Sequence, residues 1–209
     1  MHTRRATRTR AGLGARAARL FRVFLLGLRA PHLRKAVQLT AVAAAVLEGF
    51  PDSCSPAGLR AAGARGATIM QSALRRRVKI PSGSVLRGAE DLLAGALAMA
   101  AVLPGIRRDR PASWPLVTAV FADSAELIHR LGGLLSRCRS QGAGQRSLKF
   151  AAEADGLRRR LAAERLSLLS SGGAADVAGL LALLSGAEHL AGTAELVAER
   201  SCGGVEHET

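Results

Sequence analysis

Proline, glycine and serine interrupt this chain at intervals that leave six segments of helical length. Ala, Leu, Arg and Gly dominate these segments, tyrosine is absent and β-branched residues are few, a composition that favours helix over strand. Residues 107–111 form a charged linker between the third and fourth segments. The breaks predict an all-α protein with helices over 31–48, 56–78, 85–103, 113–139, 147–169 and 174–202.

The charged linker divides the predicted helices into two triplets. We expect a basic tail or the start of the first helix at residues 1–30, a first three-helix bundle at 31–106 and a second at 107–209. The pentapeptide Gly88–Leu92 in the third helix, Gly-Ala-Glu-Asp-Leu, recurs 98 residues later in the sixth helix as Gly186–Leu190, Gly-Ala-Glu-His-Leu. Because both copies lie at the same point of a triplet, the repeat indicates an internal duplication.

The positive charge is concentrated in the first part of the chain. The formal net charge is +14; residues 1–87 carry 17 Lys/Arg against only Glu48 and Asp52, whereas residues 88–209 carry 13 Lys/Arg against 14 Asp/Glu. A basic half favours phosphate groups, an anionic membrane surface or an acidic partner. We expect a disordered basic tail at residues 1–30, and an organellar transit peptide, which has the same composition, stays open as an alternative.

Two motifs in the C-terminal third resemble a known family. Phe150–Leu157, Phe-Ala-Ala-Glu-Ala-Asp-Gly-Leu, is similar to a Leu-Glu-x-Glu-Ala-Asp-x-Leu helix in the phosphate transport regulator branch of the PhoU-like family. Leu183–Glu199 is similar to the terminal helix of that family, which carries a Glu-x-x-x-Asp-His motif. The resemblance covers residues 32–202. It implies two tandem three-helix bundles and a regulator or accessory protein that contacts a membrane phosphate transporter; a homo-oligomer is a further expectation.

The sequence departs from this family at the acidic positions. In the family, Glu-x-x-x-Asp places two carboxylates one helical turn apart, where they can share a hard cation or a metal cluster. Here the first carboxylate of each pair is absent, and Leu86, Ala151 and Leu184 stand in its place. We therefore expect no cofactor and no high-affinity metal cluster. A weak residual metal site would use the acids and the histidine that remain: Glu90, Asp91, Asp155, Glu188 and His189.

A second pattern of metal-ligand type lies in the fourth predicted helix. Asp123-x-x-Glu126-x-x-His129 contains the Glu-x-x-His step of carboxylate-bridged di-iron bundles. Such a site needs a second Glu-x-x-His and two further Glu from facing helices, and the chain contains no second Glu-x-x-His. The pattern therefore predicts a solvated polar face.

Two clusters of basic residues are candidates for anion contact. Arg75, Arg76, Arg77 and Lys79 would contact an anion or a membrane surface, and Arg158–Arg160 would be solvated or paired with an acid such as Glu164. Lys/Arg clusters also bind nucleic-acid phosphates by releasing counterions. An aromatic content of 3% leaves little for base stacking. A basic helical protein that binds nucleic acid non-specifically is therefore the less favoured alternative.

The sequence lacks the motifs of common catalytic sites. It contains no Gly-x-Ser-x-Gly elbow and no Gly-rich loop that ends in Gly-Lys-Ser/Thr, and its five histidines show no ligand spacing. Three widely spaced cysteines without a Cys-x-x-Cys pair suit a reducing compartment. The longest uncharged apolar runs are shorter than the ~20 residues that span a bilayer. We expect a non-enzymatic cytoplasmic protein, peripheral to the membrane, that acts through protein contacts.

Overall fold

A computed structural model describes residues 31–49, 55–75, 84–109, 113–138, 140, 142–170 and 177–203. Within these residues the only regular elements are helices, so the all-α prediction is confirmed. The predicted tail at residues 1–30 lies outside the described residues. The helices are α2 (Pro31–Glu48), α3 (Pro56–Leu74), α4 (Val85–Ala101), α5 (Leu103–Asp109), α6 (Trp114–Leu135), α7 (Ala143–Ser170) and α8 (Ala178–Gly203).

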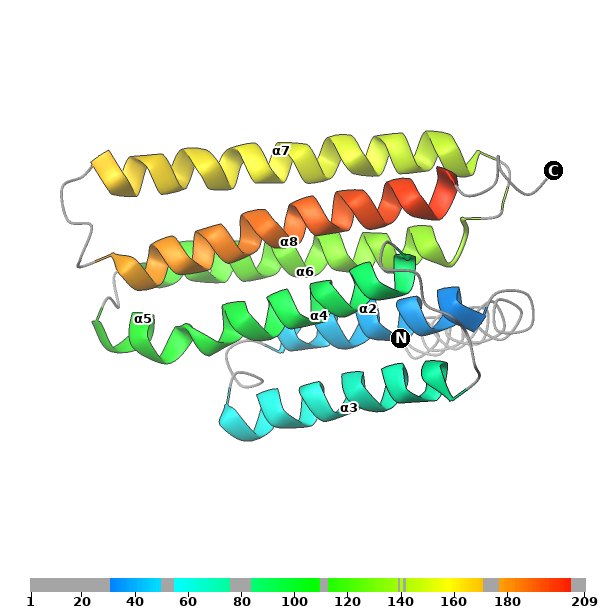
Figure 1. Cartoon of the computed structure of the whole chain (residues 1–209). Coiled ribbons are helices and arrows are strands. Elements are labelled where there is room, and N and C mark those ends of the chain that lie inside the picture. The colour runs from blue at the N-terminus through cyan, green and yellow to red at the C-terminus, as the bar shows by residue number, and fades with distance from the viewer. Residues whose placement is uncertain are drawn as a thin grey trace, which may run out of the picture.

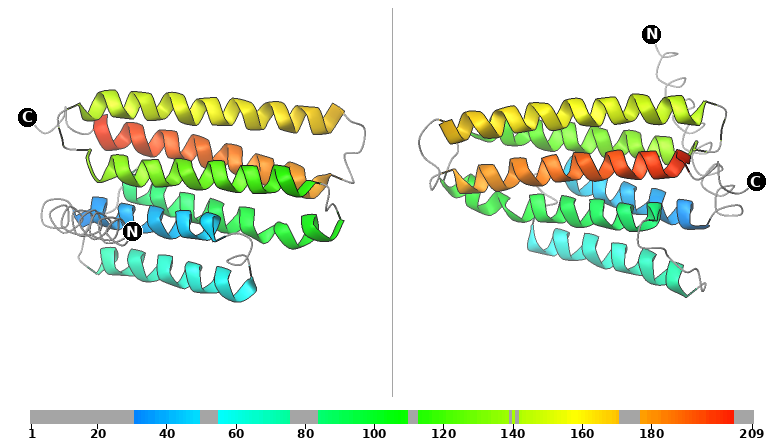
Figure 2. Two further views of the ribbon diagram at one scale, coloured as in Figure 1. Left: turned by 180° about the vertical axis from the view of Figure 1, so that it is seen from behind. Right: turned by 45° about the horizontal axis from the view of Figure 1, so that its top comes forward.

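Four helices form the centre of the molecule. The helix α2 lies against α4 and α6, and α8 lies against the same two helices, so the four close into a ring (Figure 1). On the outside, α3 covers α2 and α4, whereas α7 covers α8 and α6. The result is a stack of four layers, which both views of Figure 2 also show. Buried side chains from α2 through α8 form one continuous hydrophobic core.

The helices α4 and α8 run antiparallel through this core and bury the same positions. Every buried apolar side chain of α4 has a buried counterpart in α8, 98 residues later. The buried positions are three or four residues apart, as expected for one apolar face of a helix. The pairs are Val85/Leu183, Leu86/Leu184, Ala89/Ala187, Leu92/Leu190, Leu93/Ala191, Ala96/Ala194, Met99/Val197 and Ala100/Ala198.

Two glycines allow α4 and α8 to approach closely. Gly88 of α4 lies against Val197 of α8, and a Cβ on the glycine would meet Val197 Cγ2 at 2.3 Å. Gly186 of α8 lies against Met99 of α4, where an added Cβ would meet Met99 Cγ at 3.0 Å. Since Gly88 and Met99 are the 98-residue counterparts of Gly186 and Val197, the two contacts are related by an approximate two-fold axis.

Two predicted helix starts are confirmed by their caps. The Ser55 Oγ atom accepts a hydrogen bond of 3.1 Å from the Gly58 N–H, and Pro56 occupies the first turn of α3. Proline is tolerated there because the first N–H groups of a helix have no partner within it. Ser84 caps α4 in the same way by accepting a hydrogen bond of 3.2 Å from the Arg87 N–H.

Other predicted boundaries are wrong. Residues 107–109 belong to the helix α5 and not to a linker, because Pro104 occupies the first turn of that helix, where it does not break the structure. The helix α7 begins four residues before the predicted Ser147, since the positive φ of 74° is confined to Gly142. The helices α3 and α6 end earlier than predicted, at Leu74 and Leu135, and α8 is described from Ala178 to Gly203.

Within the part of the chain that the structure describes, two stretches are long and apolar enough to cross a membrane, Val85–Ile106 and Ala178–Ser201. The first contains the central helix α4 and the second lies within α8, and 44% of the most apolar 18-residue window of each is buried inside the protein. Because the core helices of folded bundles have the same length and composition, these two features alone do not place either helix in a membrane.

Candidate functional site

The residues predicted for a weak metal site lie on three helices. Glu90 and Asp91 are on α4, Asp155 is on α7, and Glu188 and His189 are on α8. Among the residues that the structure describes, no group of three or more His, Cys, Asp or Glu side chains is placed to hold a metal ion. Glu90, Asp155 and Glu188 have arginine partners instead.

Asp155 is the most strongly paired of these acids. Arg158 Nη2 lies 2.9 Å and Arg159 Nη2 lies 2.6 Å from its two carboxylate oxygens. Partial burial disfavours the ionised carboxylate, but the hydrogen bonds and positive charges of the two arginines together outweigh burial and lower the pKa of Asp155. The carboxylate therefore forms ion pairs with two arginines of its own helix.

The repeated glutamates of α4 and α8 also have arginine partners. Glu90 pairs with Arg87, one turn earlier on α4. Glu188 pairs with Arg165 of α7, whose Nε atom lies 3.2 Å from Glu188 Oε1. The Glu188 side chain is 16% exposed, so its charge is largely enclosed by the α7–α8 contact. Glu90 and Glu188 occupy equivalent positions of the repeat, but Glu90 pairs with an arginine of its own helix and Glu188 pairs with an arginine of α7.

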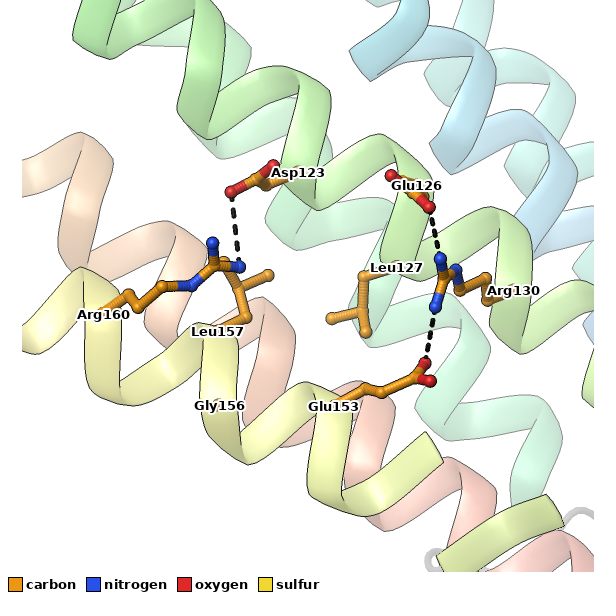
Figure 3. A pocket seen from close by; sticks show the side chains of 8 residues that line it. All are labelled: Asp123, Glu126, Leu127, Arg130, Glu153, Gly156, Leu157 and Arg160. Carbon is orange, nitrogen blue, oxygen red and sulfur yellow. Dashed lines mark hydrogen bonds and ion pairs between the residues drawn. The ribbon is translucent and has the colours of Figure 1, made fainter. Parts of the chain in front are cut away.

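A groove of about 430 Å³ lies between α6 and α7 (Figure 3). Buried Leu127 and Leu157 form its apolar part, and Gly156 adds no side chain to fill it. Charged residues from both helices surround this apolar strip, as the close view shows. The groove is open because α7 packs mainly on α8 and only lightly on α6.

Two arginines join the walls of this groove. Arg130 of α6 donates hydrogen bonds to Glu153 of α7 at 2.8 Å and to Glu126 of α6 at 2.6 Å. The hydrogen bond to Glu153 and then that to Glu126 raise the pKa of Arg130 above its usual value. Arg160 of α7 lies 3.5 Å from Asp123 of α6. Three carboxylates and two guanidinium groups thus alternate around the apolar strip.

The lining is made of carboxylates, guanidinium groups, two leucines and one glycine. It contains no Ser, Thr, Cys, His or Lys, so the side chains that most often act as nucleophiles are missing from it. To bind here, a charged ligand or partner would replace one member of an ion pair with its own charged group. The pair between Arg160 and Asp123 is the easier one to exchange, because it is the longer and the Arg160 side chain is 71% exposed.

The Asp123, Glu126 and His129 pattern does not converge on one point. Asp123 and Glu126 face α7, whereas His129 Nδ1 lies 3.5 Å from Glu48 Oε1 at the end of α2. All three side chains are exposed, as expected for a polar face. The prediction missed that each of them has an ion-pair partner.

The partners of the second basic cluster also differ from the prediction. Arg158 contacts Glu195 of α8 at 3.5 Å in addition to Asp155, and Arg160 reaches across to α6. Glu164, the predicted partner, forms no ion pair with a described residue. One groove pair was readable from the sequence, because Glu126 and Arg130 have the i,i+4 spacing of helical ion pairs. The ion pairs between helices depend on how α6, α7 and α8 pack, so they cannot be predicted from the spacing of residues in the sequence.

Of the predicted anion-contact residues, Arg75 is described and exposed at the end of α3. Arg76, Arg77 and Lys79 lie outside the described residues. Along α3 the only charged residues are Arg60 and Arg65, both exposed. The helix therefore presents positive charge without an acid of its own to balance it.

No protein-family model, curated protein or solved structure matches this chain.

Proposed function

We propose that this chain is a non-enzymatic, PhoU-like regulator or accessory protein of phosphate transport, which acts through contacts with a membrane transporter. In this proposal the chain consists of two tandem three-helix units, α2–α4 and α6–α8, and works at the cytoplasmic face of the membrane. The proposal rests on the motif resemblance together with the geometry of α4 and α8.

The observation that carries the proposal is the two-fold relation between the repeated segments. Gly88 and Gly186 occupy equivalent places in two equivalent contacts, and each half has one outer helix that covers two inner ones. A duplicated triplet of helices predicts this arrangement. It supports the tandem architecture that the family resemblance implies.

The arginine partners support protein contact over metal chemistry. The acids that would hold a metal in the resembled family are paired here with Arg87, Arg158, Arg159 and Arg165. A cation would have to displace these guanidinium groups before it could bind. The α6–α7 groove offers a partner an apolar strip with exchangeable charges beside it, and we assign the transporter contact to this groove.

Affinity purification tests both parts of the proposal. The tagged full chain is purified from its native cells in mild detergent, half the sample is treated with nuclease, and bound proteins are identified by mass spectrometry. We compare the wild type with an Asp123→Ala/Arg160→Ala variant, which removes a whole ion pair from the groove. Arg60→Ala on α3 is the control for loss of an exposed arginine.

The expected result is a phosphate transporter that survives nuclease with the wild type and with Arg60→Ala but is lost with the groove variant. A preparation without any phosphate transporter contradicts the proposed function. Retention of the transporter by the groove variant places the contact elsewhere on the molecule.

A second candidate function is non-specific nucleic-acid binding, which the uncompensated arginines of α3 favour. Phosphate contacts of this kind release counterions, so affinity for duplex DNA would fall steeply between low and moderate salt. Arg60→Glu/Arg65→Glu would then weaken DNA binding and reduce its salt dependence. Binding that is weak at low salt, or unchanged in this variant, contradicts the candidate.

A further inference from the structure

Six helix ends meet at one end of the molecule. The helices α2, α4 and α7 begin there, and α3, α6 and α8 end there, as the right-hand side of Figure 1 shows. This arrangement follows from the alternating directions of the helices. We call it the basic end. It consists of the first seven residues of α2, α4 and α7 and the last seven residues of α3, α6 and α8, together with the described turn residues next to them.

The basic end holds the charge excess of the described structure. Seven residues correspond to two helical turns. In total the described residues carry 17 Lys/Arg and 12 Asp/Glu, an excess of five. The basic end alone has an excess of six, so the rest of the described residues carry a net charge of −1. The basic end contains nine cations, Arg34, Lys35, Arg75, Arg87, Arg130, Arg137, Arg146, Lys149 and Arg200, against three acids, Glu90, Asp91 and Glu199.

The opposite end of the molecule is close to neutral. Counted in the same way over the same six helices, it contains two cations, Arg60 and Arg165, and two acids, Glu48 and Glu164. The charge of the folded part is therefore polarised along the helix axes.

Several cations of the basic end are available for a partner. Arg75, Arg137, Lys149 and Arg200 are exposed and form no ion pair with a described carboxylate. Arginines on the flank of the molecule, such as Arg158, are in contrast held by acids of α7 and α8. The basic end thus presents positive charge that is not neutralised within the described part of the protein.

The sequence that precedes α2 contains further positive charge and apolar side chains. Residues 1–30 directly precede α2, which begins at the basic end, and they contain eight arginines and no acid. They also contain the apolar stretch Leu20–Leu28, with Phe21 and Phe24. Basic and aromatic or aliphatic residues in one segment are typical of sequences that bind anionic membrane surfaces.

We propose that the basic end is a docking surface for an anionic lipid bilayer. Phosphate-rich headgroups attract exposed Lys and Arg within a Debye length of the surface. A bilayer accounts for the apolar stretch as well as the cations, whereas a nucleic-acid duplex would use the cations alone. Base stacking at the basic end has no support in the described residues, because Phe121 and Phe150 are buried and the half-buried Trp114 begins α6 at the opposite end. Lipid binding by the basic end can be tested separately from the proposed transporter contact, because the vesicles contain no transporter.

Co-sedimentation of the full chain with vesicles tests the proposal. One set of vesicles is pure phosphatidylcholine, and the other contains phosphatidylglycerol at a third of the lipid. We expect binding to the anionic vesicles only, with a loss of binding as salt rises. Arg137→Glu/Lys149→Glu should weaken this binding by roughly tenfold or more, since each cation near the surface contributes to partitioning.

The matched control is Arg60→Glu/Arg65→Glu, which makes the same change in net charge away from the basic end. It should bind anionic vesicles nearly as well as the wild type, and circular dichroism should show both variants folded. Equal losses in the two variants would mean that total charge, and not this end, governs binding. Absence of binding to anionic vesicles, or tighter binding to duplex DNA than to these vesicles at the same salt, also overturns the proposal.

Discussion

Gly88 and Val197 touch in the core, near the basic end, with no space for a side chain on the glycine, since an added Cβ would lie 2.3 Å from Val197 Cγ2. Valine is stiff at χ1 and cannot move aside freely. We predict that Gly88→Ala destabilises the protein by about 1 kcal/mol, because overpacking costs ~1–3 kcal/mol and the gain in helix propensity offsets ~1 kcal/mol. The midpoint of urea unfolding measures the change.

Two other glycines provide the controls for this prediction. At Gly186 an added Cβ would meet the flexible Met99 side chain at 3.0 Å, so Gly186→Ala should be close to neutral. At Gly95 the nearest atom, Leu190 Cδ1, is 3.9 Å away, and Gly95→Ala should stabilise the helix by up to about 1 kcal/mol. If Gly88→Ala were as stable as Gly95→Ala, the close contact between α4 and α8 would be disproved.

The fold was partly predictable from the sequence. Ser55-Pro56 and Ser84 marked the starts of α3 and α4 because capping depends on local chemistry. Pro104 and Gly144 misled the prediction, since proline in a first helical turn and glycine inside a helix do not break it when the neighbours pack well. The closed ring of α2, α4, α8 and α6 was not predictable, because it depends on contacts between distant parts of the chain.

The stability of the protein should depend on pH through Asp155. The pKa of this carboxyl group is lowered in the folded state, so the folded state favours its ionised form. The stabilising contribution is therefore present above the usual carboxyl pKa of about 4 and is lost as pH falls through the lowered value.

We predict that Asp155→Asn lowers the urea midpoint near neutral pH and that the difference from the wild type shrinks as pH falls below about 4. Glu164→Gln removes an exposed carboxylate of the same helix that has no described ion pair, and serves as the control. A difference between wild type and Asp155→Asn that is constant with pH would show that the arginine pairs of Asp155 do not contribute through its charge.

The groove between α6 and α7 should loosen without Arg130. Arg130→Gln removes the cation that Glu126 and Glu153 share, and the two carboxylates then repel each other across the groove. Amide hydrogen exchange around Glu153 should become faster by less than about tenfold, because exposed ion pairs are individually weak. Arg137→Gln, an exposed arginine outside the groove, should leave this exchange unchanged, and the same acceleration in both variants would contradict the prediction.

Protein purified without chelator should contain no stoichiometric iron, zinc or manganese. A metal would need several carboxylates in one place, whereas Glu90, Asp155 and Glu188 lie on three helices and are each paired with arginine. Elemental analysis by inductively coupled plasma mass spectrometry measures the content. One equivalent of any of these metals would contradict the prediction.

The candidate site was less predictable than the fold. The sequence singled out Asp123 and Glu126 for their spacing along one helix, and that spacing suggested metal ligands. Arg160, the partner of Asp123, and Glu153, which shares Arg130 with Glu126, come from α7, about thirty residues later, and meet α6 only through the packing of the two helices. The spacing of residues along a helix predicts ion pairs within that helix, such as Glu126 with Arg130, but it does not predict a groove between two helices.

The ring of four central helices also affects the order in which the chain can fold during synthesis. Part of the apolar face of α4 lies against α8, as the contacts of Gly88 with Val197 and of Met99 with Gly186 show, and α8 leaves the ribosome after the other described helices. Until then the first three helices expose a strip of leucine and alanine that nothing in their own half covers. Since such transiently exposed apolar surface promotes aggregation, the nascent chain is a natural client for chaperones until its final helix emerges.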